Sequence, residues 1–235
     1  MYSSKHGQSA HMNYTEVICA TGIEQLTEDN LSYMESIVPQ YRLKRARSYI
    51  RLADRYNCIA AYFLLIYSVS EKYGYRELPE IIIHPMGKPY FLERGAPCFN
   101  LSHCSGAVCC GISSHTIGVD IQDPVREIEN IISFAMSEKE RAVILSADDP
   151  EKECAGIWSM KEAYLKYTGT GLSEFMRDIN LSGYLWKSSV YRKLYAESFT
   201  IGRYSVGVFS QDKLTVCRSG HINDIVKAFR NGRRI

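Results

Sequence analysis

Three short segments of the chain carry residue types that could hold an ion or a phosphate. The first, Gly118-Val119-Asp120-Ile121-Gln122, places one acid within an apolar, β-branched run. Side chains alternate between the faces of a strand, so Gly118, Asp120 and Gln122 are expected to share one face while the isoleucines and Val119 pack inward. A carboxylate beside a glycine leaves room for an ion or a ligand phosphate. The alternative is that Asp120 only caps the turn at Pro124.

The second segment is Trp158-Ser159-Met160-Lys161-Glu162-Ala163-Tyr164-Leu165-Lys166. Trp158, Glu162 and Lys166 repeat every four residues, which places them on one face of a helix. A separate apolar stripe is predicted to face the core; it comprises Ile157, Met160, Tyr164 and Tyr167. The alternative is a solvated Glu162–Lys166 pair, worth only ~0.3–0.5 kcal/mol.

The third segment is Phe99-Asn100-Leu101-Ser102-His103-Cys104-Ser105-Gly106. A histidine, two serines and a glycine before a strand could hold phosphate oxygens through hydroxyl and backbone donors. His103 alone is more often a hydrogen-bonded structural histidine. The sequence lacks the G-x-S-x-G elbow of serine hydrolases and the glycine motifs of P-loop and dinucleotide-binding folds, which disfavours those classes.

Alternating strands and helices around these segments predict an α+β fold. Strands are expected at 15–21, 80–84, 99–101, 107–112 and 116–122, and β-hairpins over 179–216. Helices are expected at 59–73, 128–135, 137–146 (with a capping box of Ser137 and Glu140) and 155–167. After Pro39, Lys44, Arg47, Arg51 and Arg55 have helical spacing, which predicts a basic helix with all four on one face.

Taken in order, these pieces resemble the Sfp-type 4′-phosphopantetheinyl transferase family. The resemblance is carried by Gly87-Lys88-Pro89, Phe99 to His103, Gly118 to Ile121, Trp158 to Lys166 and Gly169-Thr170-Gly171-Leu172. It implies two similar α+β lobes related by a pseudo-twofold axis, with coenzyme A in the cleft between them. The expected division is a possible leader at 1–12, an N-terminal lobe at 13–115 and a C-terminal lobe at 116–235.

The resemblance also implies an activity and its residues. The enzyme transfers the phosphopantetheine group of coenzyme A to a serine of an apo acyl or peptidyl carrier protein and releases adenosine 3′,5′-bisphosphate. Asp120 and Glu162 bind Mg²⁺, a cation that prefers oxygen ligands. Glu162, or a water on the metal, takes the serine proton, and Lys166 stabilises the pyrophosphate or protonates the leaving group. Residues expected to contact coenzyme A are Lys88, Ser102, His103 and the basic set Lys44, Arg47, Arg51 and Arg55.

One position departs from the family pattern. Many members carry a second acid two residues after the strand aspartate, where this chain has Gln122. An amide carbonyl can still approach Mg²⁺, directly or through water, but it supplies no charge. An inactive coenzyme A-binding protein, for which Gln122 is the only motive, therefore stays open as a rival. Two other rivals are a metal-dependent phosphohydrolase that uses Asp120 and Glu162 and a protein-interaction module with the aromatic tail as its surface. The intact Lys161, Glu162 and Lys166 argue against the first and third.

Composition bounds the remaining questions. The 235 residues carry a net charge of +2, with 46% hydrophobic and 23% charged residues, which is typical of a globular protein and indicates neither a nucleic-acid nor a membrane partner. The apolar runs are too short to span a bilayer. Eight cysteines without a C-x-x-C pair are interpreted as reduced thiols in the cytoplasm. The resemblance favours a monomer.

Overall fold

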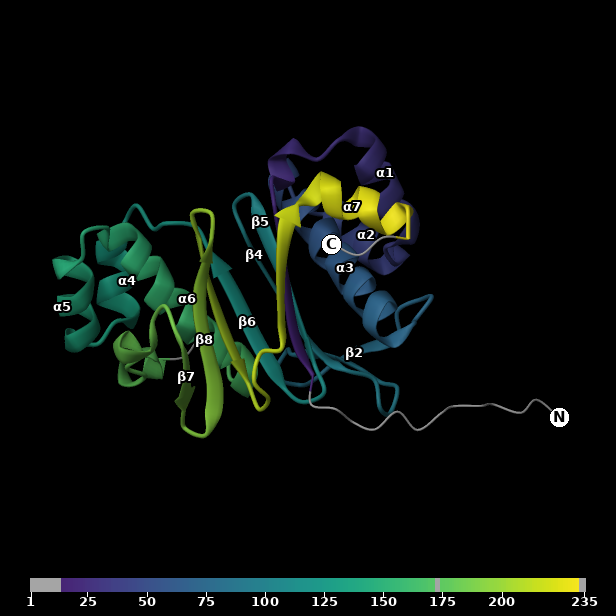
Figure 1. The fold of residues 1–235 in the computed structure, drawn as a ribbon. Helices are drawn as coiled ribbons and strands as arrows, with labels where there is room; N and C mark the ends of the chain where they lie inside the picture. Colours follow the sequence, from purple (N-terminus) through teal and green to yellow (C-terminus); the bar gives the residue numbers. More distant parts are fainter. Residues whose placement is uncertain (1–13, 172–173, 233–235) are drawn as a thin grey trace.

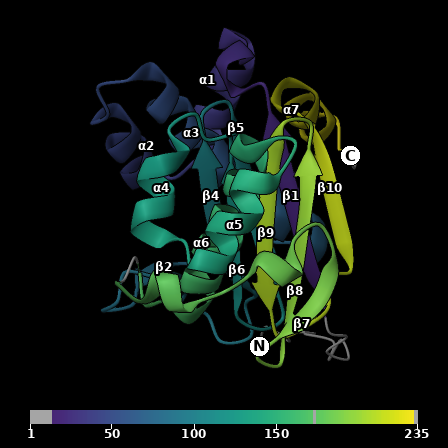
Figure 2. The same ribbon diagram turned by 90° about the vertical axis from the view of Figure 1, so that its left-hand side faces the viewer.

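The computed structural model describes residues 14–171 and 174–232. The expected leader at 1–12 and Leu172 of the last motif lie outside the described residues. Two four-stranded sheets form the centre of the molecule, and helices cover the outer face of each sheet (Figures 1 and 2). The α+β class expected from the sequence is confirmed.

The first lobe is built on a sheet with strand order β10-β1-β5-β4. Its strands are β1 (Thr15–Thr21), β4 (Cys98–Cys104), β5 (Ala107–Ser113) and β10 (Val216–His221). Its helices are α1 (Glu28–Ile37), α2 (Gln40–Arg47), α3 (Leu52–Tyr73) and α7 (Ile222–Arg230), with a short 3-10 turn at Ile23–Gln25. A two-stranded hairpin of β2 (Ile81–Ile83) and β3 (Pro89–Phe91) extends this lobe.

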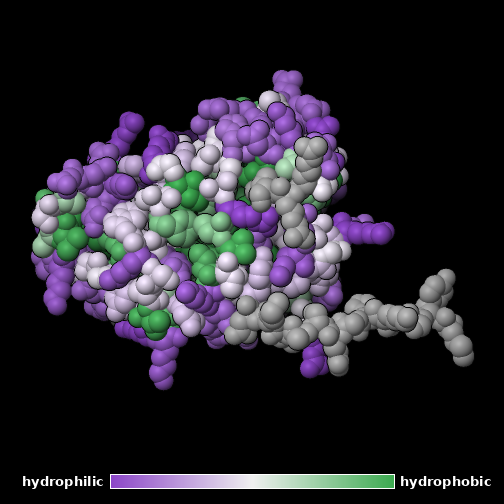
Figure 3. All heavy atoms as spheres, in the orientation of Figure 1, coloured by the Kyte–Doolittle hydropathy of each residue, from purple (hydrophilic) through white to green (hydrophobic). Residues whose placement is uncertain are grey.

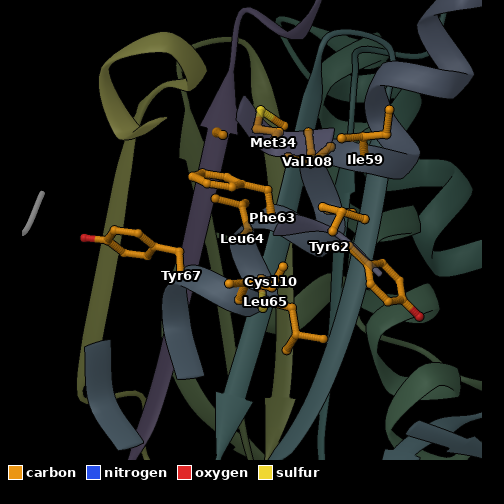
Figure 4. Packing of buried hydrophobic residues seen from close by; sticks show 14 of the residues in the cluster. Met34, Ile59, Tyr62, Phe63, Leu64, Leu65, Tyr67, Val108 and Cys110 are labelled. Atoms are coloured by element: carbon orange, nitrogen blue, oxygen red, sulfur yellow. The ribbon is translucent and has the colours of Figure 1, made fainter. Parts of the chain in front are cut away.

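Helix α3 is the core of the first lobe. Residues 57–69 are all buried, because the helix packs between the sheet and the helices around it. Figure 4 shows Phe63, Leu64 and Val108 within this cluster and the hydroxyls of Tyr62 and Tyr67 at its edges. The helix ends at Gly74, whose φ of 71° is a left-handed conformation that glycine adopts without steric cost.

The second lobe is built on a sheet of order β6-β9-β8-β7. Its strands are β6 (Ile117–Gln122), β7 (Ser188–Tyr191), β8 (Leu194–Ile201) and β9 (Tyr204–Ser210). Its helices are α4 (Ile128–Ala135), α5 (Glu138–Ser146) and α6 (Pro150–Thr168), with 3-10 turns at Glu174–Asp178 and Ser182–Tyr184. The predicted capping box of Ser137 and Glu140 begins α5.

The inner faces of the two sheets pack on each other through one apolar cluster. Val17 and Cys109 of the first sheet meet Val119 and Val206 of the second. Strand β4 also lies beside β6, where Asn100 Oδ1 accepts a hydrogen bond from the Val119 N–H at 2.9 Å. The lobes are therefore joined by buried apolar surface, and β4 and β6 bring their polar residues to one place.

The C-terminal segment returns to the first lobe. Strand β10 pairs in parallel with β1, and α7 packs its apolar side chains Ile222, Ile225 and Val226 into the core around α3. The expected division placed all of 116–235 in the second lobe. In the structure, β10 pairs with β1 and α7 packs into the core around α3, so both elements belong to the first sheet and its helices. The pseudo-twofold relation of the lobes stays a prediction.

The outer surface is mostly hydrophilic on the face shown in Figure 3, with hydrophobic residues in separate patches. Among the residues that the structure describes, no helix combines the length and the apolar character needed to cross a bilayer.

Candidate active site

Asp120 is the centre of a polar cluster between β4, β6 and α6. Its side chain is 2% exposed. Oδ1 accepts hydrogen bonds from Ser102 Oγ and Lys166 Nζ, both at 2.5 Å, and Oδ2 accepts one from Gln122 Nε2 at 2.8 Å. The predicted alternation along β6 is confirmed, because Ile117, Val119 and Ile121 belong to the cluster between the sheets. Asp120 is thus a buried carboxyl group that accepts from three donors, and not a simple turn cap.

Gly118 has a different role from the one expected. The sequence suggested that this glycine leaves room for an ion or a phosphate. In the structure, a Cβ at this position would lie 2.1 Å from the Ala163 carbonyl oxygen and 2.4 Å from the Tyr167 nitrogen. Gly118 therefore lets the backbone of α6 approach β6 directly, and this close packing brings the charged residues of α6 to Asp120.

Lys166 pairs with Asp120 across the two elements. Its ammonium donates to Asp120 Oδ1 and, at 2.8 Å, to Ser102 Oγ. Desolvation disfavours the charged ammonium, but the charge and the hydrogen bond of Asp120 outweigh this effect and raise the pKa of Lys166. The solvated Glu162–Lys166 pair considered from the sequence is therefore not the arrangement seen here.

Glu162 lies one helical turn before Lys166 and is half-buried beside Asp120. Desolvation, followed by the negative charge of Asp120, raises the pKa of Glu162 to about 6, although Lys166 acts in the opposite direction. Both Glu162 and Lys166 line a cavity of about 200 Å³, together with Lys88, Asn100 and Gly171. The site therefore has one carboxylate and two lysines on the wall of the cavity, with the buried Asp120 behind them.

Strand β4 places its polar residues on either side of this cluster. Ser102 is buried against Asp120, whereas His103 is exposed at the edge. Desolvation lowers the pKa of His103, and the positive charges of Lys166 and Arg42 lower it further. A neutral His103 offers one ring N–H donor and one ring acceptor near neutral pH.

Lys88 connects the β2–β3 hairpin to the second lobe. Its ammonium donates to the carbonyl oxygens of Ile117 (3.1 Å) and Tyr167 (2.9 Å). Desolvation lowers the pKa of Lys88 to about 8. Lys88 also lines a second cavity of about 300 Å³, whose wall includes Phe99 and Tyr167. The ammonium therefore donates to two backbone carbonyl oxygens. Lys88 lines both cavities.

The predicted basic helix is wrong as a continuous element. Helix α2 ends at Arg47, Arg51 is the N-cap of α3 and Arg55 lies inside α3, so Lys44, Arg47, Arg51 and Arg55 do not share one helical face. Lys44, Arg47 and Arg51 are exposed, and Arg55 Nε donates to the Tyr49 carbonyl oxygen at 3.0 Å. Apolar packing of Leu43 and Ala46 fixes the short α2, and the chain turns before α3 begins.

Arg42 is a basic residue that the sequence argument missed. Its charge contributes to the lowered pKa of His103, and its guanidinium lies 4.3 Å from the centre of the Tyr62 ring. Arg42 Nε is buried without a hydrogen-bond partner among the described residues. Arg42 lies in the basic run after Pro39, but the helical spacing predicted Lys44, Arg47, Arg51 and Arg55 as the basic set instead.

The carboxylates of this site fit a hard divalent cation. The negative charge of Asp120 raises the cost of a negative charge on Glu162, and a cation between such oxygens would relieve it. Among the described residues, no group of three or more His, Cys, Asp or Glu side chains forms a metal site, so the acidic donors here are these two. Gln122 donates its amide to Asp120 in this arrangement, and its direct ligation of a metal stays a prediction.

The polar cluster around Asp120 lies where β4 of the first lobe meets β6 and α6 of the second. Residues 116–215 match the 4′-phosphopantetheinyl transferase superfamily. This part of the chain is thus similar to that superfamily, and the predicted resemblance to its Sfp-type members is confirmed.

Three relatives illustrate the similarity. 4′-Phosphopantetheinyl transferase Sfp of Bacillus subtilis (strain 168) is 29% identical over 149 residues, which cover 62% of this chain and 66% of Sfp. The uncharacterized protein YieE of Escherichia coli (strain K12) is 30% identical over 46% of each chain. 4′-Phosphopantetheinyl transferase HetI of Nostoc sp. is 31% identical over 37% of this chain and 40% of HetI. The aligned segments thus span less than two thirds of these relatives.

Proposed function

We propose that this protein transfers the 4′-phosphopantetheine group of coenzyme A to a serine of an apo acyl or peptidyl carrier protein. The products are the holo carrier and adenosine 3′,5′-bisphosphate. The observation that carries the proposal is the buried Asp120, hydrogen-bonded to Ser102 and Lys166 and facing Glu162 on the wall of a cavity. The match of residues 116–215 to the superfamily and the names of the relatives support it.

In this reaction the carrier serine oxygen attacks the phosphorus next to the pantetheine arm. The bond between this phosphorus and the bridging oxygen of the pyrophosphate breaks, and the bridging oxygen leaves with the nucleotide. Glu162, a carboxylate on the wall of the cavity, takes the serine proton. Lys166, kept protonated by Asp120, donates to the pyrophosphate oxygens and neutralises the leaving group.

Asp120 and Glu162 would hold Mg²⁺ in this site. When bound, Mg²⁺ neutralises charge on the pyrophosphate. Ser102 now donates to Asp120 and accepts from Lys166, so it orients both residues toward the ligand. The neutral ring of His103, which keeps one N–H donor, and the guanidinium of Arg42 lie at the edge of the site, where we propose that they bind the nucleotide phosphates.

The exposed basic residues that do not reach the site suggest a second role. Arg47 and Arg51 flank Ile50, which is 99% exposed, and Leu52, which is 56% exposed. Carrier proteins present the acceptor serine at the start of an acidic helix, and an acidic, partly apolar partner is complementary to this combination of charge and apolar surface. We propose that the carrier docks on the segment between α2 and α3.

A mass measurement tests the reaction. The purified protein is mixed with coenzyme A, Mg²⁺ and a panel of apo carriers, and the intact mass of each carrier is recorded. We expect a carrier to gain one phosphopantetheine group, and the gain to disappear with a chelator or in Glu162→Ala. No gain on any carrier, together with calorimetric binding of coenzyme A, would favour the alternative of an inactive coenzyme A-binding protein, for which Gln122 is the motive.

We further propose that the protein acts as a cytoplasmic monomer. Both lobes and all the side chains of the proposed site come from a single chain, so the site is complete without a second copy. Light scattering at working concentration, with and without coenzyme A, measures the oligomeric state directly, and a ligand-dependent dimer would contradict the proposal.

A further inference from the structure

A buried ion pair lies on the side of α6 that faces away from the candidate active site. Lys161 immediately precedes Glu162, and its side chain is completely buried. The Lys161 ammonium lies 2.7 Å from Glu140 Oε2 and donates to the carbonyl oxygens of Ala135 and Met176, also at 2.7 Å. An ammonium has three donors, so this group is fully satisfied.

Glu140 is satisfied just as completely. Its Oε1 accepts from the Leu181 N–H at 2.8 Å, and its Oε2 accepts from the N–H and the hydroxyl of Ser137, each at 2.9 Å. The pair therefore ties α6 to the last residue of α4, the first turn of α5, and two positions that follow the Gly169–Gly171 turn along the chain. That turn lines the cavity beside Glu162.

Stability alone does not account for this arrangement. A buried ion pair often contributes no more than a well-packed apolar pair of similar volume, because two charges must lose their water. Such a pair does fix geometry, since each charged group must keep its partners in place. The geometry that it fixes here is the orientation of α6.

Two glycines set how closely α6 approaches the sheet. A Cβ at Gly118 would lie 2.1 Å from the Ala163 carbonyl oxygen, and one at Gly207 would lie 2.5 Å from the Ser159 carbonyl oxygen. These contacts set a distance, but a helix at that distance can still turn about its own axis. The three acceptors around the Lys161 ammonium oppose that turning. Because Glu162 is the next residue, any rotation that moved Lys161 would also move Glu162 relative to Asp120.

We propose that Lys161 and Glu140 are positioning residues of the active site. They hold α6 at the rotation that presents Glu162 to Asp120, and through the Met176 carbonyl they hold the chain that follows the Gly169–Gly171 turn. This inference rests on the proposed function, because it assigns the pair to the site that binds the cation and coenzyme A.

The first lobe provides a matched control. Glu16 of β1 is also completely buried, and its Oε1 accepts from Arg218 Nε of β10 at 2.7 Å. This pair belongs to the first sheet, and we assign it no part in the chemistry. The comparison is therefore between Lys161→Met/Glu140→Gln and Glu16→Gln/Arg218→Met, two double variants that each remove both charges of a buried pair.

Three quantities are measured for each variant: kcat, KM for coenzyme A, and the affinity for Mn²⁺ in the presence of coenzyme A, from the electron paramagnetic resonance signal of free Mn²⁺. For the Lys161/Glu140 variant we expect kcat to fall roughly 10–100-fold and Mn²⁺ affinity to fall about tenfold, as is typical when the groups that orient metal ligands are removed. The KM for coenzyme A should change by less than about threefold. The Glu16/Arg218 variant should lose thermal stability but keep kcat and Mn²⁺ affinity within about twofold.

A folded Lys161/Glu140 variant with wild-type kcat and Mn²⁺ affinity would overturn the proposal. If that variant does not fold at 25 °C, Lys161→Arg provides the second test. It keeps the charge, but its planar fork cannot reproduce the three contacts of the ammonium, so a folded Lys161→Arg protein should show at least a tenfold lower kcat, and a wild-type kcat would refute the inference. Mn²⁺ binding that depends on the pair, in a wild-type protein that modifies no carrier, would reject the proposed function and retain the positioning role.

Discussion

The two long helices, α3 in the first lobe and α6 in the second, have different uses. Helix α3 packs across the first sheet and buries residues 57–69 without interruption. Helix α6 packs across the second sheet through Gly118 and Gly207, and it carries a buried lysine on one side and the candidate active-site residues on the other. The first lobe uses its helix to build a core, whereas the second uses its helix to place charges.

Helix α3 therefore contributes mainly to stability, and α6 carries the residues proposed to do the chemistry. The buried polar side chains of α3 are Asn57 and Ser68, and neither is charged. The charges of α6 are held by partners from other elements, because Lys166 bonds Asp120 and Lys161 bonds Glu140. Changes in α3 should therefore act on unfolding, and changes in α6 should act on turnover.

The largest expected effect is on turnover, from Glu162→Gln in α6. Loss of this carboxylate removes the proposed base and metal ligand, so kcat for carrier modification should fall roughly 10³-fold. The free energy of unfolding of the metal-free protein at pH 8 should not fall, because the raised pKa of Glu162 shows that its charged form is disfavoured in the fold. Rates are measured from the carrier mass, and stability from urea titrations.

Ser68→Ala in α3 is the control for this change. The Ser68 hydroxyl donates to the Leu64 carbonyl oxygen at 2.8 Å within its own helix, and its loss should leave kcat unchanged. A Glu162→Gln protein that retained more than about a tenth of wild-type activity would show that the chemistry does not depend on α6.

The second prediction concerns α3, where a substitution should lower stability and leave turnover unchanged. Phe63→Ala in α3 removes a fully buried ring that packs edge-on against Phe229, with centroids 5.6 Å apart, and should cost about 3–5 kcal/mol of unfolding free energy. Because Phe63 lies away from Asp120, kcat per folded molecule should not change. Urea unfolding combined with rates corrected for the folded fraction checks both statements. A tenfold fall in kcat per folded molecule would mean that the first lobe shapes the site as well as supporting it.

Features with a local cause were predictable from the sequence. The bounds of β1, the end of α3 at Tyr73 and the capping box of α5 all followed from residues close together in the chain. The alternation that brings Asp120 to one face of β6 was also local. These signals are reliable because a strand period, a cap or a left-handed glycine needs no knowledge of the rest of the fold.

Features with a distant cause were not predictable. The pairing of β10 with β1 joins residues about 200 positions apart. The sequence of Val216 to His221 does not indicate which strand it pairs with. The contact between Lys166 and Asp120 depends on how α6 lies on β6, whereas the sequence displayed only the helical spacing of Glu162 and Lys166. The complete burial of Lys161 runs against the usual behaviour of lysine, and only the surrounding acceptors explain it.

The third prediction concerns the contact by which α6 reaches the sheet. Gly118→Ala places a methyl group against the backbone of Ala163 and Tyr167, so α6 must move away from β6. We expect a loss of about 1–3 kcal/mol in unfolding free energy and a several-fold lower kcat, because Glu162 and Lys166 move with the helix. Gly183→Ala in the same lobe meets no atom within 4 Å and should change neither. Equal behaviour of the two variants would show that α6 is not seated through Gly118.

The smallest expected effect is on the Mg²⁺ requirement, from Gln122→Glu beside the two acids Asp120 and Glu162. Gln122 lies two residues after Asp120 and donates its amide to Asp120 Oδ2 at 2.8 Å. In Gln122→Glu this donor becomes a third carboxylate, and its repulsion from Asp120 is relieved only when a cation binds. The Mg²⁺ concentration for half-maximal activity should therefore fall, by about three- to tenfold.

The measurement is a titration of activity against Mg²⁺ for wild type and variant at constant ionic strength. Gln25→Glu adds the same charge at an exposed position of the first lobe and should leave the Mg²⁺ requirement unchanged. In the metal-free protein, Gln122→Glu should lower the melting temperature, because the hydrogen bond to Asp120 is replaced by repulsion. Lower stability without tighter Mg²⁺ dependence would place residue 122 outside the metal shell, as a support for Asp120 alone. Tighter dependence would show that the second lobe can hold its cation with three acids and that this chain works with two.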